Sequence, residues 1–166
     1  MSDRADLQAQ IDRVDEFITT LSPAGETFVR QLRAQTYIAV AGDDFPSVAY
    51  FNAQTLTSHF PLDASFAELF NYRVHEGAHA IQALFVPYII QALAKLETQK
   101  GFVEISLPDL VTFTRVCEIN ANATQAYFNA QAVAKTGDTS YVECFKDDHT
   151  LKYLLRRQHA LIDQGK

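Results

Sequence analysis

The segment His75-Glu76-Gly77-Ala78-His79 constrains this chain more than any other stretch, because its two histidines stand four residues apart. Positions i and i+4 lie one above the other on a helix, so both imidazoles of a helical segment can reach one metal ion. Glu76 can then reach a water molecule beside the ion without binding the ion itself. Two neutral imidazoles suit zinc, and a catalytic zinc site needs a third protein ligand and an open position for water.

The flanking sequence predicts that this segment is helical from about 65 to 84. Apolar residues recur at steps of three and four between Phe66 and Ile81, which is typical of a helix with one buried face. Asp63 or Ser65 is expected to cap its start. Gly77 is its one poor helix former, at a cost of about 1 kcal/mol relative to alanine. We therefore expect another helix or a substrate to come close at Gly77.

The whole chain, 1–166, predicts a single domain with a mostly helical α+β fold. Two central helices carry the expected metal ligands, and the helices at the two ends are expected to be structural. Pro87 should end the helix that carries His75-Glu76-x-x-His79 (the HExxH helix) near Leu84, or kink it. In chain order we expect helices at 3–21 and 22–34, a small β-hairpin or three-stranded sheet between 37 and 60, the HExxH helix, and helices at 88–99, 107–135 and 140–164.

Charge and cysteine content narrow the class of protein. The net charge is −6 and no cluster of Lys and Arg occurs, which argues against nucleic acid or an anionic membrane as a partner. Cys117 and Cys144 are too few and too far apart for a disulfide framework or a cysteine zinc site. No apolar run is long enough to span a bilayer, and the first ten residues lack the apolar core of a signal peptide. We expect a cytoplasmic protein, and the sequence does not determine its oligomeric state.

Two histidines need a third ligand, and Glu118 is the favoured candidate. The carboxylate lies among apolar neighbours in the alanine-rich helix predicted at 107–135, where burying a charge is costly unless it binds a cation. Asn122, one turn further along, is predicted to accept a hydrogen bond from the free N–H of a ligating imidazole. The other candidates for the third ligand are His59, His149, His159 and Asp147.

His75-Glu76-x-x-His79, followed by Glu118-x-x-x-Asn122 on a later helix, resembles the gluzincin-type (thermolysin-like) zinc metallopeptidases in their minimal, single-domain form. It is similar also to bacterial families of metallopeptidase domains, and the resemblance covers about 37–135. It implies a zinc-dependent peptidase, with His75, His79 and Glu118 as zinc ligands and Glu76 as the general base that takes a proton from a metal-activated water.

Two departures from the family pattern stand out. The family usually has Asp where this chain has Asn122, so the imidazole beside it would be a less basic ligand. No residue clearly matches the family's oxyanion-stabilising His or Tyr, and four candidates stay open: Tyr127, Tyr141, Tyr153 and His149.

The resemblance implies a peptide or protein substrate, for which the strand expected at 54–59 would offer a free edge. A di-iron carboxylate protein is the first rival reading, but it needs a second Glu-x-x-His, which the chain lacks. A non-catalytic, zinc-containing protein-binding module is the second rival, and no feature of the sequence excludes it.

Overall fold

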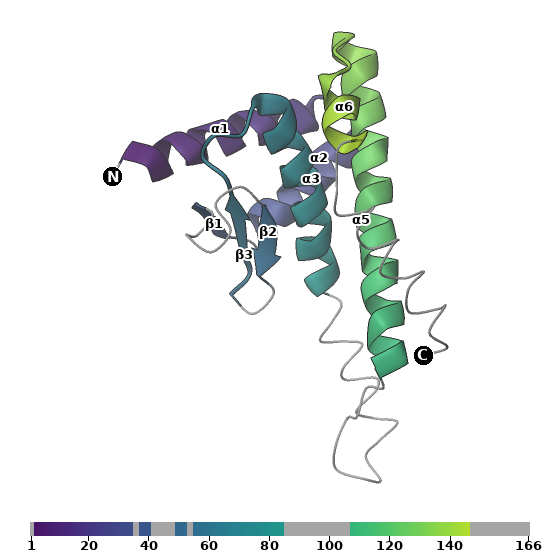
Figure 1. The fold of residues 1–166 in the computed structure, drawn as a ribbon. Coiled ribbons are helices and arrows are strands. Elements are labelled where there is room, and N and C mark those ends of the chain that lie inside the picture. Colours follow the sequence, from purple (N-terminus) through teal and green to yellow (C-terminus); the bar gives the residue numbers. More distant parts are fainter. Residues whose placement is uncertain (1, 35–36, 41–48, 53–54, 85–106, 147–166) are drawn as a thin grey trace.

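The computed structural model describes residues 2–34, 37–40, 49–52, 55–84 and 107–146 (Figure 1). Its architecture over these residues is mostly helical with one small sheet, which confirms the predicted α+β class. The effect of Pro87, the helix expected at 88–99 and the part of the C-terminal helix after Lys146 lie outside the described residues.

Two helices precede the sheet, as the sequence predicts. Helix α1 spans Ser2–Thr19 and helix α2 spans Pro23–Arg33. Ser22 caps α2 by accepting a hydrogen bond from the backbone N–H of Gly25 at 3.3 Å, and Pro23 stands in the first turn, where a missing N–H costs nothing. The apolar residues of α1 that recur at steps of three and four are all buried: Leu7, Ile11, Val14 and Ile18.

The sheet has three strands in the order β1-β3-β2: β1 (Tyr37–Val40), β2 (Tyr50–Asn52) and β3 (Thr57–Phe60). β1 pairs parallel with β3, and β2 pairs antiparallel with it. The prediction that the segment 54–59 offers a free edge is therefore wrong, because both sides of β3 are paired. β3 also begins later than expected, since Leu56 has a φ of 52°, which an extended strand does not allow.

Helix α3 (Phe66–Ala83) carries the HExxH segment, and helix α5 (Leu107–Thr136) lies beside it in the opposite direction (Figure 1). Both lie where the sequence predicts helices. Gly137, with a φ of 73°, takes the left-handed conformation that ends a helix, and its N–H bonds to the Val133 carbonyl at 2.8 Å. Helix α6 (Ser140–Lys146) then packs against both α3 and α5.

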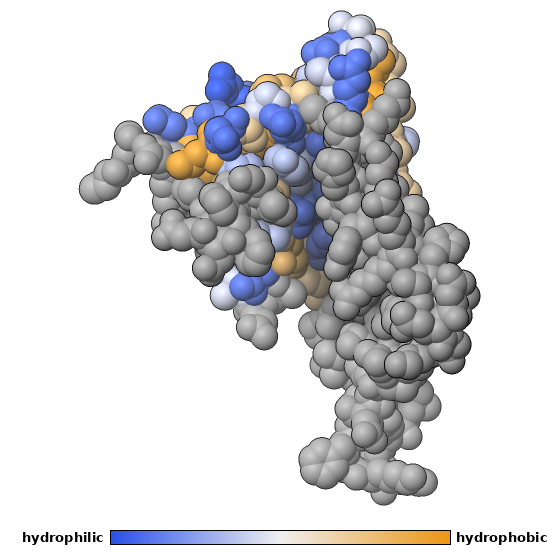
Figure 2. Space-filling view, viewed as in Figure 1, coloured by the Kyte–Doolittle hydropathy of each residue, from blue (hydrophilic) through white to orange (hydrophobic). Residues whose placement is uncertain are grey.

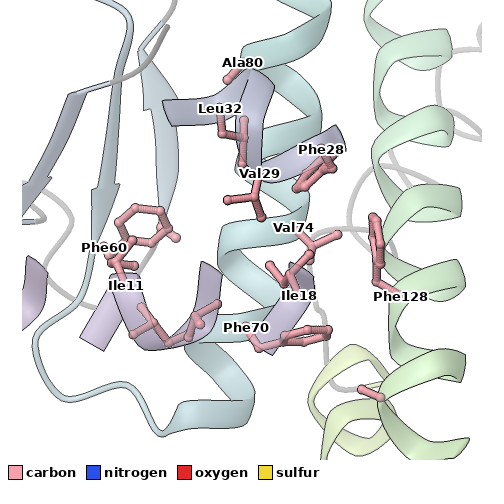
Figure 3. Packing of buried hydrophobic residues seen from close by; sticks show 14 of the residues in the cluster. Ile11, Ile18, Phe28, Val29, Leu32, Phe60, Phe70, Val74, Ala80 and Phe128 are labelled. Carbon is pink, nitrogen blue, oxygen red and sulfur yellow. The ribbon is translucent and has the colours of Figure 1, made fainter. Parts of the chain in front are cut away.

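One hydrophobic core joins these elements (Figure 3). It lies between α1, α2 and α3 and is closed by Phe60 from β3 and Phe128 from α5. Gly77 shows how tightly α2 packs on α3: a Cβ at this position would lie 2.7 Å from a methyl group of Leu32 and 2.9 Å from the ring of Phe28. The close approach expected at Gly77 is therefore made by another helix.

Candidate metal centre

Local interactions fix where α3 begins. The Ser65 hydroxyl accepts from the Glu68 N–H at 3.3 Å, and the Glu68 carboxylate accepts from the Ser65 N–H at 2.8 Å. This reciprocal capping box selects Ser65 over Asp63 as the cap. His75 and His79 lie one turn apart in this helix and share one face.

Three potential ligand side chains converge at this face: His75 and His79 from α3 and Glu118 from α5. Glu118 Oε2 lies 3.5 Å from His75 Nε2, and Glu118 Oε1 lies 3.3 Å from His79 Nε2. The two Nε2 atoms are 3.2 Å apart. All three residues are partly buried, and their ligand atoms lie within 4.8 Å of one another. Helix α5 thus brings to the histidines the carboxylate that the sequence favours as third ligand.

The charges of this cluster support one another. Hydrogen bonds from His75 and His79 lower the pKa of the Glu118 carboxyl to about 2. Burial, the largest single effect, would lower the pKa values of the two imidazoles, but the hydrogen bonds to Glu118 and the negative charges of Glu118 and Glu76 together outweigh it, so both pKa values are raised. In the metal-free cluster each histidine therefore binds a proton more readily, and Glu118 less readily, than the free side chain does.

Glu76 lies next to the cluster on the inner side of α3. It is buried, and this burial raises the pKa of its carboxyl against the opposing effects of His75 and His79. The backbone of Phe51, in strand β2, forms a hydrogen bond with the carboxylate, which lowers the same pKa by a smaller amount. Glu76 therefore contacts β2, which is an edge strand among the strands that the structure describes.

The outer nitrogen of each imidazole contacts a glutamine. His75 Nδ1 lies 3.1 Å from the Gln125 Oε1 atom, and His79 Nδ1 lies 2.9 Å from the Gln82 Oε1 atom. The prediction that Asn122 accepts from a ligating imidazole is wrong: its buried Oδ1 atom has no hydrogen-bond partner, and its Nδ2 atom donates to the Glu118 backbone carbonyl at 2.8 Å. Asparagine within a helix readily makes this bond to the carbonyl four residues back.

The donor set fits a divalent cation. A carboxamide oxygen only accepts hydrogen bonds, so a neutral imidazole that faces one carries its proton on Nδ1 and leaves Nε2 with a lone pair. Both Nε2 atoms and the Glu118 carboxylate are then acceptors, and no donor lies among them. Such a cluster is stable with protons or with a cation at its centre, and two imidazole nitrogens with one carboxylate oxygen are a zinc donor set.

The other residues singled out in the sequence lie elsewhere. His59 stacks on Tyr50 across the sheet, with ring centroids 4.3 Å apart, and is not part of the cluster. Tyr141 packs in the core against Phe17 and Phe70, so its ring is unsuited to stabilise an oxyanion. Tyr127 is half exposed on α5. The remaining candidates lie outside the described residues: Asp147, His149, Tyr153 and His159.

Sequence reasoning missed Gln82 and Gln125, although a signal for both was present. Polar residues recur on α5 at Glu118, Asn122, Gln125 and Asn129, in steps of four, three and four. On α3 they recur at Asn71, His75, His79 and Gln82, in steps of four, four and three. Each series marks one helix face, and hydrophilic surface runs down the molecule over α3 (Figure 2). Two facing polar stripes indicate a hydrogen-bonded seam between the helices.

The chain was compared with protein-family models, curated proteins and solved structures, and none of them matches it. Within the part of the chain that the structure describes, no helix combines the length and the apolar character needed to cross a membrane.

Proposed function

We propose that this protein is a zinc-dependent peptidase of the gluzincin type. One observation carries the proposal: two imidazole nitrogens and a carboxylate from separate helices come within 4.8 Å of one another, with a buried glutamate on the adjoining turn. Three protein ligands leave one position of a tetrahedral site for water, as a catalytic zinc site requires.

His75, His79 and Glu118 would hold the ion, and a bound zinc would supply Lewis acidity and lower the pKa of a bound water. Glu76 has the properties of the general base. Glu76 directly follows the expected ligand His75 in α3. Burial raises the pKa of its carboxyl, which makes the carboxylate a stronger base. Its hydrogen bond to the Phe51 backbone fixes its orientation. In this role Glu76 accepts a proton from water and passes it to the departing amine.

The substrate class follows from the strand beside Glu76. Among the described strands β2 pairs with β3 alone, and an extended peptide would add at its other edge, beside the Phe51 backbone that bonds Glu76. A peptide added there would lie next to both Glu76 and the cluster. Main-chain hydrogen bonds of this kind select for extended peptides and little for their side chains. We further propose that the protein works in the cytoplasm, where the free Cys117 thiol stays reduced.

The test compares wild type with Glu76→Gln for zinc content and for hydrolysis of a quenched-fluorescent peptide library. We expect one zinc per chain in both proteins, and hydrolysis at least about 100-fold slower in the variant, because general-base catalysis contributes a factor of about 10²–10⁴. Glu16→Gln, which removes an exposed carboxylate from α1, should change neither. Equal hydrolysis by wild type and Glu76→Gln would contradict the peptidase; zinc without any hydrolysis would favour a protein-binding module.

A further inference from the structure

We propose that Gln82 and Gln125 are positioning residues that hold both imidazoles in the Nδ1–H tautomer, with each Nε2 lone pair directed at the same point. This inference rests on the proposed metal site and adds a role for two residues outside its ligand set. It is carried by two chains of hydrogen bonds, each of which ends on backbone carbonyl oxygens. A carbonyl oxygen only accepts, so it fixes the direction of every bond in the chain that leads to it.

The first chain starts at Asn71, which is buried between α3, α5 and α6. Its Nδ2 atom donates to the Ala67 carbonyl at 2.8 Å and to the Tyr141 carbonyl at 3.0 Å. Since both acceptors are backbone oxygens, the amide nitrogen must lie at this end of the side chain. The Oδ1 atom of Asn71 therefore points toward α5 as an acceptor.

Gln125 and Asn129 both donate to that oxygen. The Gln125 Nε2 atom lies 2.7 Å from Asn71 Oδ1, and the Asn129 Nδ2 atom lies 2.9 Å from it. With its nitrogen committed to Asn71, Gln125 can present only its oxygen to His75 Nδ1, 3.1 Å away. All three carboxamides are buried, so water cannot replace a bond that a flipped amide would break. The proton of a neutral His75 is thus held on Nδ1.

The second chain is shorter and shares no residue with the first. The Gln82 Nε2 atom donates to the Cys117 carbonyl and to the Asn120 Oδ1 atom, both at 2.9 Å. Its Oε1 atom then faces His79 Nδ1 at 2.9 Å. Gln82 stands on α3 and both of its acceptors stand on α5, next to Glu118. The same side chain therefore orients His79 and ties it to the helix that carries the third ligand.

Together the two chains act on the histidines from opposite ends of the seam. A rotated or inverted imidazole would place an N–H where the ion binds and would lose its bond to a glutamine oxygen. Because the tautomer is fixed before the ion binds, the imidazoles need not rotate or move a proton on binding, and the binding free energy does not include that cost. Outer hydrogen-bond partners of this kind typically contribute a factor of about 10–100 to metal affinity.

The test measures the zinc dissociation constant of the full chain by competition with a chromophoric chelator. We expect Gln82→Leu and Gln125→Leu each to bind zinc about 10–100-fold more weakly than wild type. Gln82→Glu should lose less affinity than Gln82→Leu, because its carboxylate still accepts from His79 Nδ1–H although it can no longer donate to the Cys117 carbonyl and to Asn120. Gln131→Leu is the matched control: it removes a carboxamide from α5 six positions beyond Gln125, where its Oε1 atom has no hydrogen-bond partner.

Thermal unfolding in the presence of chelator shows which variants are folded. If Gln125→Leu does not fold, the Gln82 variants still test the inference, because Gln82 is only partly buried. Equal loss of affinity in Gln82→Leu and Gln82→Glu would overturn the inference, because packing would then explain both.

Histidine ¹⁵N spectra of metal-free protein, at a pH above the imidazole pKa values, give a second readout. We expect protonated Nδ1 and unprotonated Nε2 in both residues; the opposite tautomer would overturn the inference. Absence of zinc from wild type would refute the proposed function and leave this spectrum decisive.

Discussion

At the scale of single residues, the site depends on which atom each polar side chain reaches, and helix geometry decides only part of this. A separation of four residues on a helix places His75 and His79 together whatever surrounds them. The same periodicity places Asn122 on the face of Glu118, but it cannot say which atom the amide reaches. In the structure the nearest acceptor is a carbonyl of its own helix, and the imidazoles are served by glutamines.

A pH prediction belongs to this scale. The pKa of Glu118 falls from 4.5 to about 2 on folding, so its contribution to stability is present above pH 4.5 and is lost as the pH falls toward 2. The pKa values of His75 and His79 rise above 6.5 on folding, so their contribution is present below 6.5 and is lost as the pH rises through their folded values. The cluster should therefore stabilise metal-free protein most between pH 4.5 and 6.5.

The measurement is the melting temperature of chelated protein as a function of pH, for wild type and Glu118→Gln. Removing the carboxylate removes the partner of both imidazoles, so the gap between the two curves should be widest in that window. A gap that stays constant from acid to alkaline pH would contradict the assigned ionisation states.

At the scale of elements, the sequence predicted the helices well because their signals are local. Ser22-Pro23, Ser65 with Glu68, and Gly137 mark helix ends through bonds to their own neighbours. The sheet order was not predictable in this way, because alternation within a strand does not specify its partner. The sequence of α1 also gives no local signal that Asp15 is buried against Arg73 of α3, at 2.8 Å.

That ion pair gives a prediction about how α1 is held against α3. Asp15 and Arg73 are both buried, and the pair is bidentate, with a second bond of 3.0 Å. Arg73→Met should lower the free energy of unfolding by about 3–5 kcal/mol, because it leaves a buried carboxylate short of its partner. Arg33→Met is the matched control: Arg33 bonds the same carboxylate at 3.1 Å but is half exposed, so its loss should cost at most about 1 kcal/mol. Equal losses in urea unfolding would contradict this assignment.

The contact between α2 and α3 gives a second prediction at this scale. Gly77→Ala adds a methyl group where Leu32 and Phe28 already fill the space. Overpacking of this kind typically costs about 1–3 kcal/mol, which should exceed any gain from the better helix propensity of alanine. Urea unfolding of chelated protein measures the balance, and an alanine variant more stable than wild type would show that α2 can move away freely. Ala123→Gly, at an exposed position of α5, measures the effect of the Ala/Gly difference in helix propensity without any change in packing.

At the scale of the whole molecule, the core and the site are separate layers that share α3. Its apolar face packs against α1 and α2, and its polar face meets α5 around the cluster. Composition and periodicity predicted the apolar face. The partner of the polar face was predicted instead from the cost of burying Glu118 unpaired, because periodicity alone does not relate segments whose ligands lie 118 − 79 = 39 residues apart.

Because α3 and α5 both supply ligands, a bound ion should stabilise the molecule as a whole. Zinc at 100 times its dissociation constant should raise the free energy of unfolding by about 2.7 kcal/mol, provided that the unfolded chain does not bind it. His79→Ala should abolish that gain, whereas His59→Ala, at a histidine outside the cluster, should retain it. A zinc-induced rise in melting temperature that survives His79→Ala would place the ion elsewhere.

The most direct test of the central claim is the anomalous difference map of zinc-loaded crystals, recorded at the zinc absorption edge. We expect one peak per chain, at about 2.0–2.2 Å from the Nε2 atoms of His75 and His79 and from a carboxylate oxygen of Glu118. A zinc ion bound elsewhere, or one bound to the two histidines with the Glu118 carboxylate turned away, would contradict the account.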